Sequence, residues 1–446
     1  MSSALEAVSP VDGRYAKQSA PLKDYFSEFA LFKFRVRVEI EYLIAFAFQI
    51  KSPGFSESES NSVREIYRNF TLQDAEQIKD IERHTNHDIK AVEYFVKQKL
   101  EAINLGAIKE WVHFGLTSQD INNTAIPLSL KEANEVVIFP AISALIEQTE
   151  KLAKSWKDVP MLARTHGQPA SPTTLGKEFY VFAERLSIQF RQLQQTVWAA
   201  KFGGATGNLN AHYVAYPAVD WVTFSNDFVS TLGLYRSRTT TQIEHYDQLA
   251  SYCHNLSRIN TILIDFCRDT WMYIMMEYFR QRVNPGETGS SAMPHKVNPI
   301  DFENAEGNLG IANALLEHFA AKLPVSRLQR DLTDSTVLRN LGVPLAHSLI
   351  SFESLKKGLD KLVLNEAAIA ADLQKHTVVI AEAIQTILRR ENYPEPYETL
   401  KKLTRGKESI DLPYIREFIR TLDVADSVKA ELLHLTPENY TGRISF

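Results

Sequence analysis

The stretch between Gly233 and Pro285 contains neither glycine nor proline, and it constrains the fold more than any other feature of the sequence. Its apolar residues recur at alternating intervals of three and four. This spacing predicts one helix of more than about thirty residues, roughly 50 Å long. The seam consists of Leu249, Tyr252, Leu256, Ile259, Leu263, Phe266, Thr270 and Tyr273. Ile262, Trp271 and Met275 beside the seam are apolar as well, so other helices must surround this one.

Four further segments have a helical periodicity and few helix breakers. One follows Ser171-Pro172, which suit an N-cap and a first helical position, and ends at Gly203-Gly204. The others span residues 300–323, 335–362 and 122–156. Five long helices that share apolar faces predict a central bundle.

Helical patterns also occupy the regions before and after this bundle. Residues 27–50 and 73–103 are helical in pattern, and the helices after residue 361 are shorter and more charged. We therefore predict an all-α protein with three consecutive helical domains. Their predicted bounds are residues 1–110, residues 111–361 with the long-helix bundle, and residues 362–446.

The charge balance and the apolar runs disfavour several classes of protein. Among 446 residues, 49 are Lys or Arg and 54 are Asp or Glu, which argues against a protein that coats nucleic acid. The N-terminus lacks the basic and apolar regions of a signal peptide, and the longest apolar run, residues 259–276, carries charges. Cys253 and Cys267 are fourteen residues apart on one helix, too far for a disulfide. We expect a cytoplasmic protein with no nucleic-acid or membrane partner.

Residues 281–299 form a long connection between two predicted helices, and such loops are usually functional or disordered. Gly289 allows a tight bend before Ser290-Ser291, whose hydroxyls and amides can converge on a ligand. Lys296 adds a positive charge and Asn298 an amide. These groups suit a carboxylate, or a carbanion delocalised into one, whereas a plain surface loop is the alternative.

Two shorter segments place polar groups near expected helix starts. His166 lies in a rigid turn and can transfer protons near neutral pH, although taken alone it is more often a structural histidine. Thr117 and Asp120 fit a helix-capping box, and capping alone is the simpler interpretation. The functional interpretation is a site where hydroxyls and helix N-terminal amides hold a carboxylate.

Together, these three segments resemble those of the fumarase/aspartase superfamily, whose members eliminate fumarate from a substituted succinate. Gly289 through Pro299 matches its signature Gly-Ser-Ser-x-Met-Pro-x-Lys-x-Asn-Pro. Thr117-Ser118, Thr165-His166 and Ser290 follow one another in the order that the superfamily has. The resemblance therefore covers essentially the whole chain.

Within the superfamily, the chain resembles the adenylosuccinate lyases of the bacterial type. His295 precedes the signature lysine, where fumarases tend to have glycine and argininosuccinate lyases glutamine. One departure is His245-Tyr246 after Glu244, where the resemblance leads us to expect Pro-His. Further matching runs are residues 9–15, 85–88, 240–244, 301–304 and 330–339.

The resemblance implies an acid–base elimination of fumarate from two substrates of purine biosynthesis. Adenylosuccinate would give AMP, and the succinylaminoimidazole-carboxamide ribotide would give the aminoimidazole-carboxamide ribotide. It also implies a homotetramer whose core is the long-helix bundle, active sites shared among three subunits, and neither cofactor nor metal.

Such an elimination needs a base, an acid and a receptor for the carboxylate charge. By family position, Ser290 is the base and His166 is the acid. The resemblance places further residues at the substrate: Thr117, Ser118, Gln242, Ser291, Lys296, Asn298 and Asn304 around the succinyl carboxylates; Arg14, Tyr15, Arg330, Ser335 and Arg339 at the phosphate; and Asn86, His87, Asp88, Val297, Thr336, Val337 and Leu338 elsewhere along the substrate.

Three alternatives compete with this interpretation. His84, His87 and Asp88 on one helix suggest a metal site, although only two imidazoles and one carboxylate are local. Another lyase of the superfamily is disfavoured by His295 and by the segments that carry arginine. A non-enzymatic relative is disfavoured because the catalytic pair and the signature lysine are all present.

Overall fold

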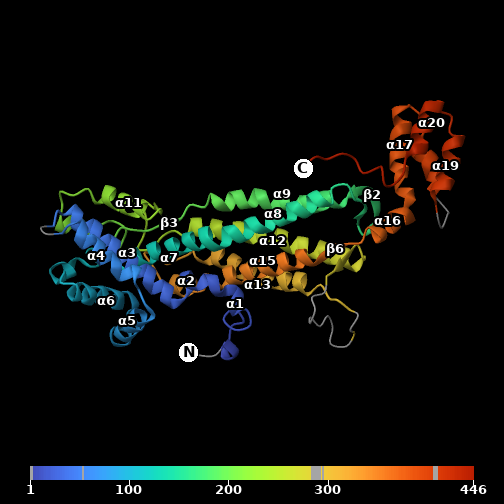
Figure 1. Cartoon of the computed structure of the whole chain (residues 1–446). Helices are drawn as coiled ribbons and strands as arrows, with labels where there is room; N and C mark the ends of the chain where they lie inside the picture. The colour runs from blue at the N-terminus through green and yellow to red at the C-terminus, as the bar shows by residue number, and fades with distance from the viewer. Residues whose placement is uncertain (1–3, 53–54, 283–292, 294–295, 405–409) are drawn as a thin grey trace. The chain divides into compact units, whose positions relative to one another are not determined.

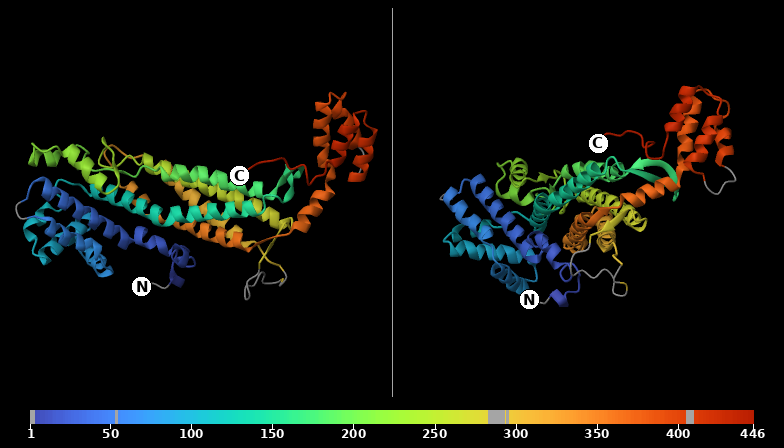
Figure 2. Two further views of the ribbon diagram at one scale, coloured as in Figure 1. Left: turned by 45° about the horizontal axis from the view of Figure 1, so that its top comes forward. Right: turned by 45° about the vertical axis from the view of Figure 1, so that its right-hand side comes forward.

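The computed structural model describes residues 4–52, 55–282, 293, 296–404 and 410–446. Helices make up most of these residues, as Figures 1 and 2 show. The strands within the described ranges form three two-stranded sheets. The prediction of an all-α fold is therefore confirmed.

The elements have the following bounds. The helices up to residue 111 are η1 (Ala4–Glu6), α1 (Ala16–Ser19), η2 (Ala20–Leu22), α2 (Lys23–Phe26), α3 (Glu28–Gln49), α4 (Glu57–Arg68), α5 (Leu72–Thr85), α6 (Asp88–Ala102) and η3 (Gly106–Trp111). Those up to residue 361 are α7 (Ser118–Ala133), the π-helical turn η4 (Asn134–Ile138), α8 (Phe139–Ser155), α9 (Leu175–Gln194), α10 (Asn210–Ala215), α11 (Trp221–Thr231), α12 (Asp247–Met275), α13 (Ile300–Lys322), α14 (Thr333–Leu338) and α15 (Gly342–Lys361). The last are α16 (Glu366–Lys375), η5 (Thr377–Ile380), α17 (Ala381–Arg390), α18 (Pro396–Thr404), α19 (Leu412–Thr421) and α20 (Asp426–His434).

The three sheets are small. Strands β1 (Pro160–Thr165) and β2 (Gln168–Thr174) pair antiparallel, β3 (Ala199–Ala200) and β4 (Tyr235–Arg236) pair in parallel, and β5 (Phe279–Gln281) and β6 (Leu362–Leu364) pair antiparallel.

By its internal contacts the chain divides into two compact units. The first comprises Met1–Ile142, Gln189–Thr261 and Gly307–Glu353, and the second comprises Ser143–Ile188, Ile262–Glu306 and Ser354–Phe446. The boundaries between them fall within α8, α9, α12, α13 and α15. The sequence-based domain bounds at residues 110 and 361 stay a prediction.

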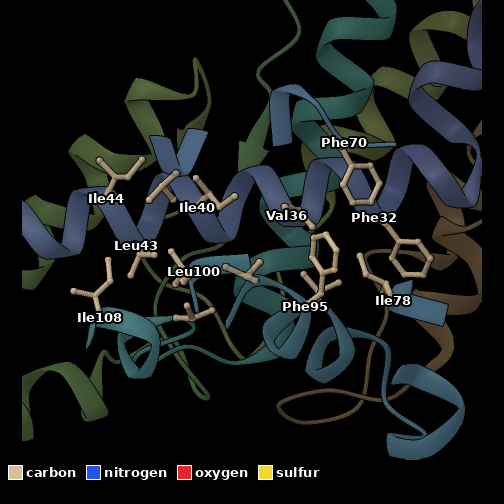
Figure 3. Packing of buried hydrophobic residues seen from close by; sticks show 14 of the residues in the cluster. Phe32, Val36, Ile40, Leu43, Ile44, Phe70, Ile78, Phe95, Leu100 and Ile108 are labelled. Carbon is tan, nitrogen blue, oxygen red and sulfur yellow. The ribbon is translucent and has the colours of Figure 1, made fainter. Parts of the chain in front are cut away.

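Helix α3 of the first unit is buried on two faces. Its Phe32, Val36 and Ile40 pack in one cluster with Ile78 of α5 and Phe95 of α6 (Figure 3). The opposite face contributes to a second cluster with α7 and α11, which contains Phe34, Val38, Tyr42, Phe46, Ile121 and Trp221. Full burial of each large apolar side chain stabilises the fold by about 1.5–3 kcal/mol, so packing holds α3 more firmly than helix propensity does.

Helix α12 is the longest helix among the described residues, but it is shorter than predicted. It has 29 residues and begins at Asp247, so it spans about 43 Å rather than 50 Å. Residues Tyr235–Arg236 form β4 instead, and Tyr246 has a left-handed backbone with φ 61°. Strand pairing and this turn therefore keep the start of the stretch out of the helix. Cys253 and Cys267 both lie on α12, as predicted, and are buried free thiols.

Other helix bounds were predicted with mixed success. Residues 300–323 match α13 to within one residue, and residues 122–156 match α7, η4 and α8 taken together. The helix start predicted at Ser171-Pro172 is wrong, because these residues belong to β2, which pairs with β1. Helix α9 begins only at Leu175 and already ends at Gln194. The segment 335–362 contains two helices. Between α14 and α15 the chain turns, and backbone amides there donate hydrogen bonds to carbonyls three residues earlier.

The second unit has two separate groups of packed side chains. Trp156, Phe179 and Phe279 lie with ring centres 4.9 to 5.8 Å apart, and Phe266 of α12 contacts Phe179 at 5.3 Å. Residues of α17, α18, α19 and α20 form a core of their own between Ile380 and Leu432. Among all residues with described structure, no helix is long and apolar enough to cross a membrane.

Candidate active site

The first unit brings together Arg330 and Ser335, which were predicted for the phosphate end of a nucleotide, and Gln242, which was predicted for the succinyl carboxylates. Arg330 Nη2 donates to Ser335 Oγ at 3.0 Å, and Arg330 Nη1 donates to Gln242 Oε1 at 3.4 Å. Helix α14 has only six residues, and the Ser335 amide already donates to Asp334 Oδ1 at 2.7 Å. This segment therefore offers a phosphate its arginine and hydroxyl side chains rather than free helix amides.

Asp88 links Arg339 to Arg35, a residue for which the sequence predicted no role. Its Oδ2 accepts from Arg35 Nη2 at 2.8 Å and from Arg339 Nη2 at 3.1 Å, while its Oδ1 accepts from the Ile89 amide at 2.9 Å. Burial by itself raises the pKa of Asp88, but Arg35, the Ile89 amide and Arg339 together hold that pKa below its ordinary value. Asp88 is thus a fixed anion that orients Arg339.

Arg35 on α3 is only 3% exposed, and its Nε donates to Asn122 Oδ1 of α7 at 2.9 Å. It therefore ties the Asp88–Arg339 pair to the helix that carries Thr117 and Ser118. Nothing in its local sequence distinguishes it, because Arg35 lies between Lys33 and Arg37 in a helix that carries several other charged residues.

A cavity of about 170 Å³ opens beside these groups in the first unit. Its polar lining consists of Ser27, Glu28, Arg35, Gln119, Asn122, Ser129, Ser335 and Arg339. Its apolar lining comes from Tyr25, Phe26, Leu31, Ile126, Leu338 and Leu341. Gln119, which the sequence analysis did not select, also donates to Ser335 Oγ at 3.5 Å, and its place directly after Thr117-Ser118 was the available signal. The cavity thus combines two arginines, one carboxylate and several neutral polar groups with apolar walls.

The start of α7 has the predicted capping box. The Thr117 amide donates to Asp120 Oδ2 at 2.8 Å, and Thr117 and Ser118 are half-buried. Asp120 also pairs with Lys201, whose Nζ lies 2.7 Å from its Oδ1. Burial lowers the pKa of Lys201, while Asp120 opposes that shift. The capping interpretation is therefore confirmed, and the carboxylate-binding interpretation of this segment stays a prediction.

The departure at His245-Tyr246 adds a buried connection. The Tyr246 hydroxyl donates to Asp334 Oδ2 at 2.9 Å and accepts from Asn123 Nδ2 at 2.7 Å. Burial, with Asp334 nearby, raises the pKa of Tyr246 well above its ordinary value, so the hydroxyl keeps its proton. This contact joins α7 to α14 directly behind Ser335.

In the second unit, His166 lies at the tip of the β1–β2 hairpin. Thr165 pairs with Gln168, and the two residues between them have φ values of 52° for His166 and 74° for Gly167. The His166 side chain is exposed. Arg164 Nη2 donates to Asp372 Oδ2 of α16 at 2.7 Å, which fixes the hairpin within this unit. The predicted rigid turn is confirmed, but a strand follows it rather than a helix.

The signature segment is described only in part. Ser290, Ser291 and His295 lie outside the described residues. Lys296 and Val297 are exposed, and the Val297 carbonyl accepts from Gln281 Nε2 at 3.1 Å. Asn298 is half-buried just before α13, and Asn304 is half-buried within it.

The remaining predicted residues lie at helix ends or on short helices of the first unit. Arg14 is exposed, with its guanidinium 6.0 Å from the ring centre of Tyr15. Thr336, Val337 and Leu338 belong to α14, and Leu338 lines the cavity.

The segment considered for a metal is not one helix. His84 lies in the last turn of α5, Asn86 has a left-handed backbone, and His87 caps α6 by accepting from the Lys90 amide at 3.1 Å. Asp88 is engaged by Arg35 and Arg339. In the part of the chain that the structure describes, no three His, Cys, Asp or Glu side chains gather as metal ligands.

Two family models match the chain, one described as a lyase over residues 13–312 and one as adenylosuccinate lyase C-terminal over residues 326–441. The adenylosuccinate lyase of Dictyostelium discoideum is 58% identical over 452 residues, which cover 99% of this chain and 97% of that protein. The adenylosuccinate lyase of Escherichia coli K12 is 50% identical over 445 residues with the same coverage. The chain belongs to the adenylosuccinate lyase family.

Solved structures support the fold of this lyase. The 3-carboxy-cis,cis-muconate lactonizing enzyme of Pseudomonas putida has a TM-score of 0.73 at 19% identity and covers 94% of this chain and 93% of its own. A fumarate lyase of Mesorhizobium sp. BNC1 has a TM-score of 0.73 at 18% identity, with 94% of both chains covered. At these identities the two structures are similar to this lyase in fold alone.

Proposed function

We propose that this lyase cleaves adenylosuccinate to AMP and fumarate, and the succinylaminoimidazole-carboxamide ribotide to the aminoimidazole-carboxamide ribotide and fumarate. The observation that carries the proposal is the identity of 50–58% to adenylosuccinate lyases across nearly the whole chain. The cavity beside Arg330, Ser335 and Arg339 adds support, because a nucleotide needs a cationic end and apolar walls.

The proposed chemistry is an elimination by a base and an acid. Ser290 removes the proton next to a carboxylate, and His166 protonates the nitrogen that leaves. A serine hydroxyl is a poor base unless its alkoxide is stabilised, and Lys296 with nearby amides is proposed to supply that stabilisation. Thr117, Ser118 and Asn298 then hold the carboxylates on which negative charge accumulates.

Arg330, Ser335 and Arg339 are proposed to bind the phosphate. Their guanidinium and hydroxyl groups suit phosphate oxygens, and Asp88 holds Arg339 in place at 3.1 Å. The phosphate is remote from the bond that breaks. Its contacts should therefore be similar in the ground state and in the transition state.

We further propose a homotetramer with active sites shared among three subunits. Within the second unit, α9 and α12 expose large apolar side chains, and exposed apolar surface of this kind is typical of a protein–protein interface. Among them are Val181, Ile188, Trp271, Met272 and Met275, which are 38% to 61% exposed. A symmetric assembly would cover them. The buried free thiols Cys253 and Cys267 suit the reducing cytoplasm, where we propose that the enzyme works.

The direct test is to incubate the purified protein with adenylosuccinate and to measure AMP and fumarate by chromatography. We expect the two products in equal amounts. Argininosuccinate and malate serve as competing substrates in parallel reactions. Fumarate from either of them, with none from adenylosuccinate, would show that the chain is a different lyase of the same superfamily.

Arg339→Ala should weaken AMP binding by about 2–3 kcal/mol, the scale of a hydrogen bond to a charged group. Because the contact is equal in the ground and transition states, KM should rise more than kcat falls. Inhibition by AMP should weaken to a similar extent, and inhibition by fumarate should hardly change. The measurement is steady-state kinetics with each product as inhibitor.

Arg327→Ala is the matched control for this substitution. Arg327 precedes the same segment, and its side chain is 77% exposed. Among the ion pairs described for it, its partner is Asp331. Its loss should leave both inhibition constants unchanged. If Arg339→Ala weakened inhibition by fumarate as much as inhibition by AMP, the phosphate would have been assigned to the wrong end of the site.

A further inference from the structure

Asp120 and Lys201 form an ion pair that is fully buried in the first unit and that the proposed chemistry does not use. Both side chains have 0% exposure, and Lys201 Nζ lies 2.7 Å from Asp120 Oδ1. Burying two charges costs several kcal/mol per ion before their attraction offsets it, so such a pair is weak evidence of a stabilising role. The groups around the pair indicate a different role.

The Asp120 carboxylate accepts hydrogen bonds from backbone amides of two separate segments. It accepts from Thr117 at 2.8 Å at the start of α7. It also accepts from Gly203 at 2.7 Å and from Gly204 at 3.1 Å, in the loop that follows β3. Lys201 adds a bond from its Nζ to the Gly204 carbonyl. One buried carboxylate therefore fixes the Thr117-Ser118 segment against residues 203–207.

The loop 203–207 in turn holds a third segment. Gly204 and Gly207 have φ values of 77° and 78°, which favour glycine. A Cβ on Gly207 would lie 2.4 Å from the Thr240 carbonyl oxygen, so the two backbones are in direct contact. The Ala205 carbonyl accepts from Gln242 Nε2 at 3.1 Å. Gln242 is thereby placed relative to Thr117 and Ser118 through Asp120.

We propose that Asp120 and Lys201 are positioning residues that set the geometry of Thr117, Ser118 and Gln242 as one receptor for the succinyl carboxylates. This inference rests on the proposed function and adds the groups that preorganise its carboxylate end. The nucleotide end has contacts that do not involve Asp120, since Asp88 orients Arg339 and Asp334 accepts from the Tyr246 hydroxyl, although Arg330 Nη1 also donates to Gln242 Oε1 at 3.4 Å. Disturbing the pair should therefore affect fumarate and AMP unequally.

The test uses the full-length enzyme with Asp120→Asn and with the double variant Asp120→Asn/Lys201→Met. The single variant leaves a buried lysine without its anion and should lower the melting temperature. The double variant removes both charges, so the melting temperature should recover. The inhibition constant for fumarate should rise about ten- to a hundredfold in both variants, the scale of one or two charge-assisted hydrogen bonds. The constant for AMP should change less than about threefold.

The double variant separates positioning from stability. Recovery of the melting temperature together with weak fumarate inhibition supports the proposal. Normal inhibition by fumarate in the double variant, or an equal rise of the inhibition constants for fumarate and AMP, overturns the proposal. The ion pair would then act only through fold stability. If the single variant does not fold, the double variant alone decides between these outcomes.

Lys131→Met is the matched control on the same helix. Lys131 lies 3.2 Å from Glu135 in a partly exposed pair four residues apart, so its loss should leave both inhibition constants unchanged. The wild-type enzyme tests the proposed function separately. Absence of adenylosuccinate cleavage by the wild type would refute the function, whereas failure of the positioning role appears only in the variants.

Discussion

Ser290→Ala should lower kcat by about a hundred- to ten-thousandfold, the usual contribution of a positioned general base or acid. Fumarate and AMP should still bind, because the hydroxyl acts in the transition state while other groups hold the products. Steady-state kinetics together with calorimetric titration of both products measures the two effects. Ser290 lies outside the described residues, so this assignment rests on its place in the signature.

Ser62→Ala controls for the loss of a serine hydroxyl. Ser62 is exposed on α4 and its hydroxyl donates only to the Ser58 carbonyl among the bonds described for it, so kcat should be unchanged. Near-normal turnover of Ser290→Ala would remove Ser290 as the base. Ser291→Ala would then be the next variant to measure.

Mixing two inactive variants, Ser290→Ala and His166→Ala, should restore activity. If the base and the acid of one site come from different subunits, some sites in a hybrid tetramer contain neither substitution. For an equal mixture with random exchange, about a quarter of the sites should be intact. The measurement is adenylosuccinate cleavage as a function of time after mixing.

Each variant incubated alone is the baseline for this experiment, and two differently tagged preparations report subunit exchange. Activity that rises as hybrid tetramers form supports the shared site. Verified exchange without any return of activity would contradict it, because base and acid would then come from the same subunit.

Local patterns in the sequence were enough to predict the class of fold and several helices. The periodicity of residues 300–323 predicted α13 to within one residue, since a helix depends on contacts three and four residues apart. The capping box of Thr117 and Asp120 could also be predicted, because both of its partners lie within one helical turn. The resemblance of the signature segments supplied the expected site residues.

The tertiary structure decided what depends on partners far along the chain. Pro172 reads as a helix start, yet pairing with β1 makes it part of a strand that follows His166. Parallel pairing of β4 with β3, together with the left-handed turn at Tyr246, likewise keeps the residues before Asp247 out of α12. Local signals lose to such pairing because a ladder of backbone hydrogen bonds outweighs a weak capping preference.

The site shows the same division between the amino-acid sequence and the fold. The sequence determined an all-helical lyase and the chemical groups that it carries. The fold alone determined that Arg35 and Arg339 share Asp88, and that Lys201 reaches Asp120 across 81 positions of the chain. Arg35 and Lys201 lie in segments whose local pattern gives them no function. Their roles come from burial, because a charge removed from water must find its partner wherever the fold places one.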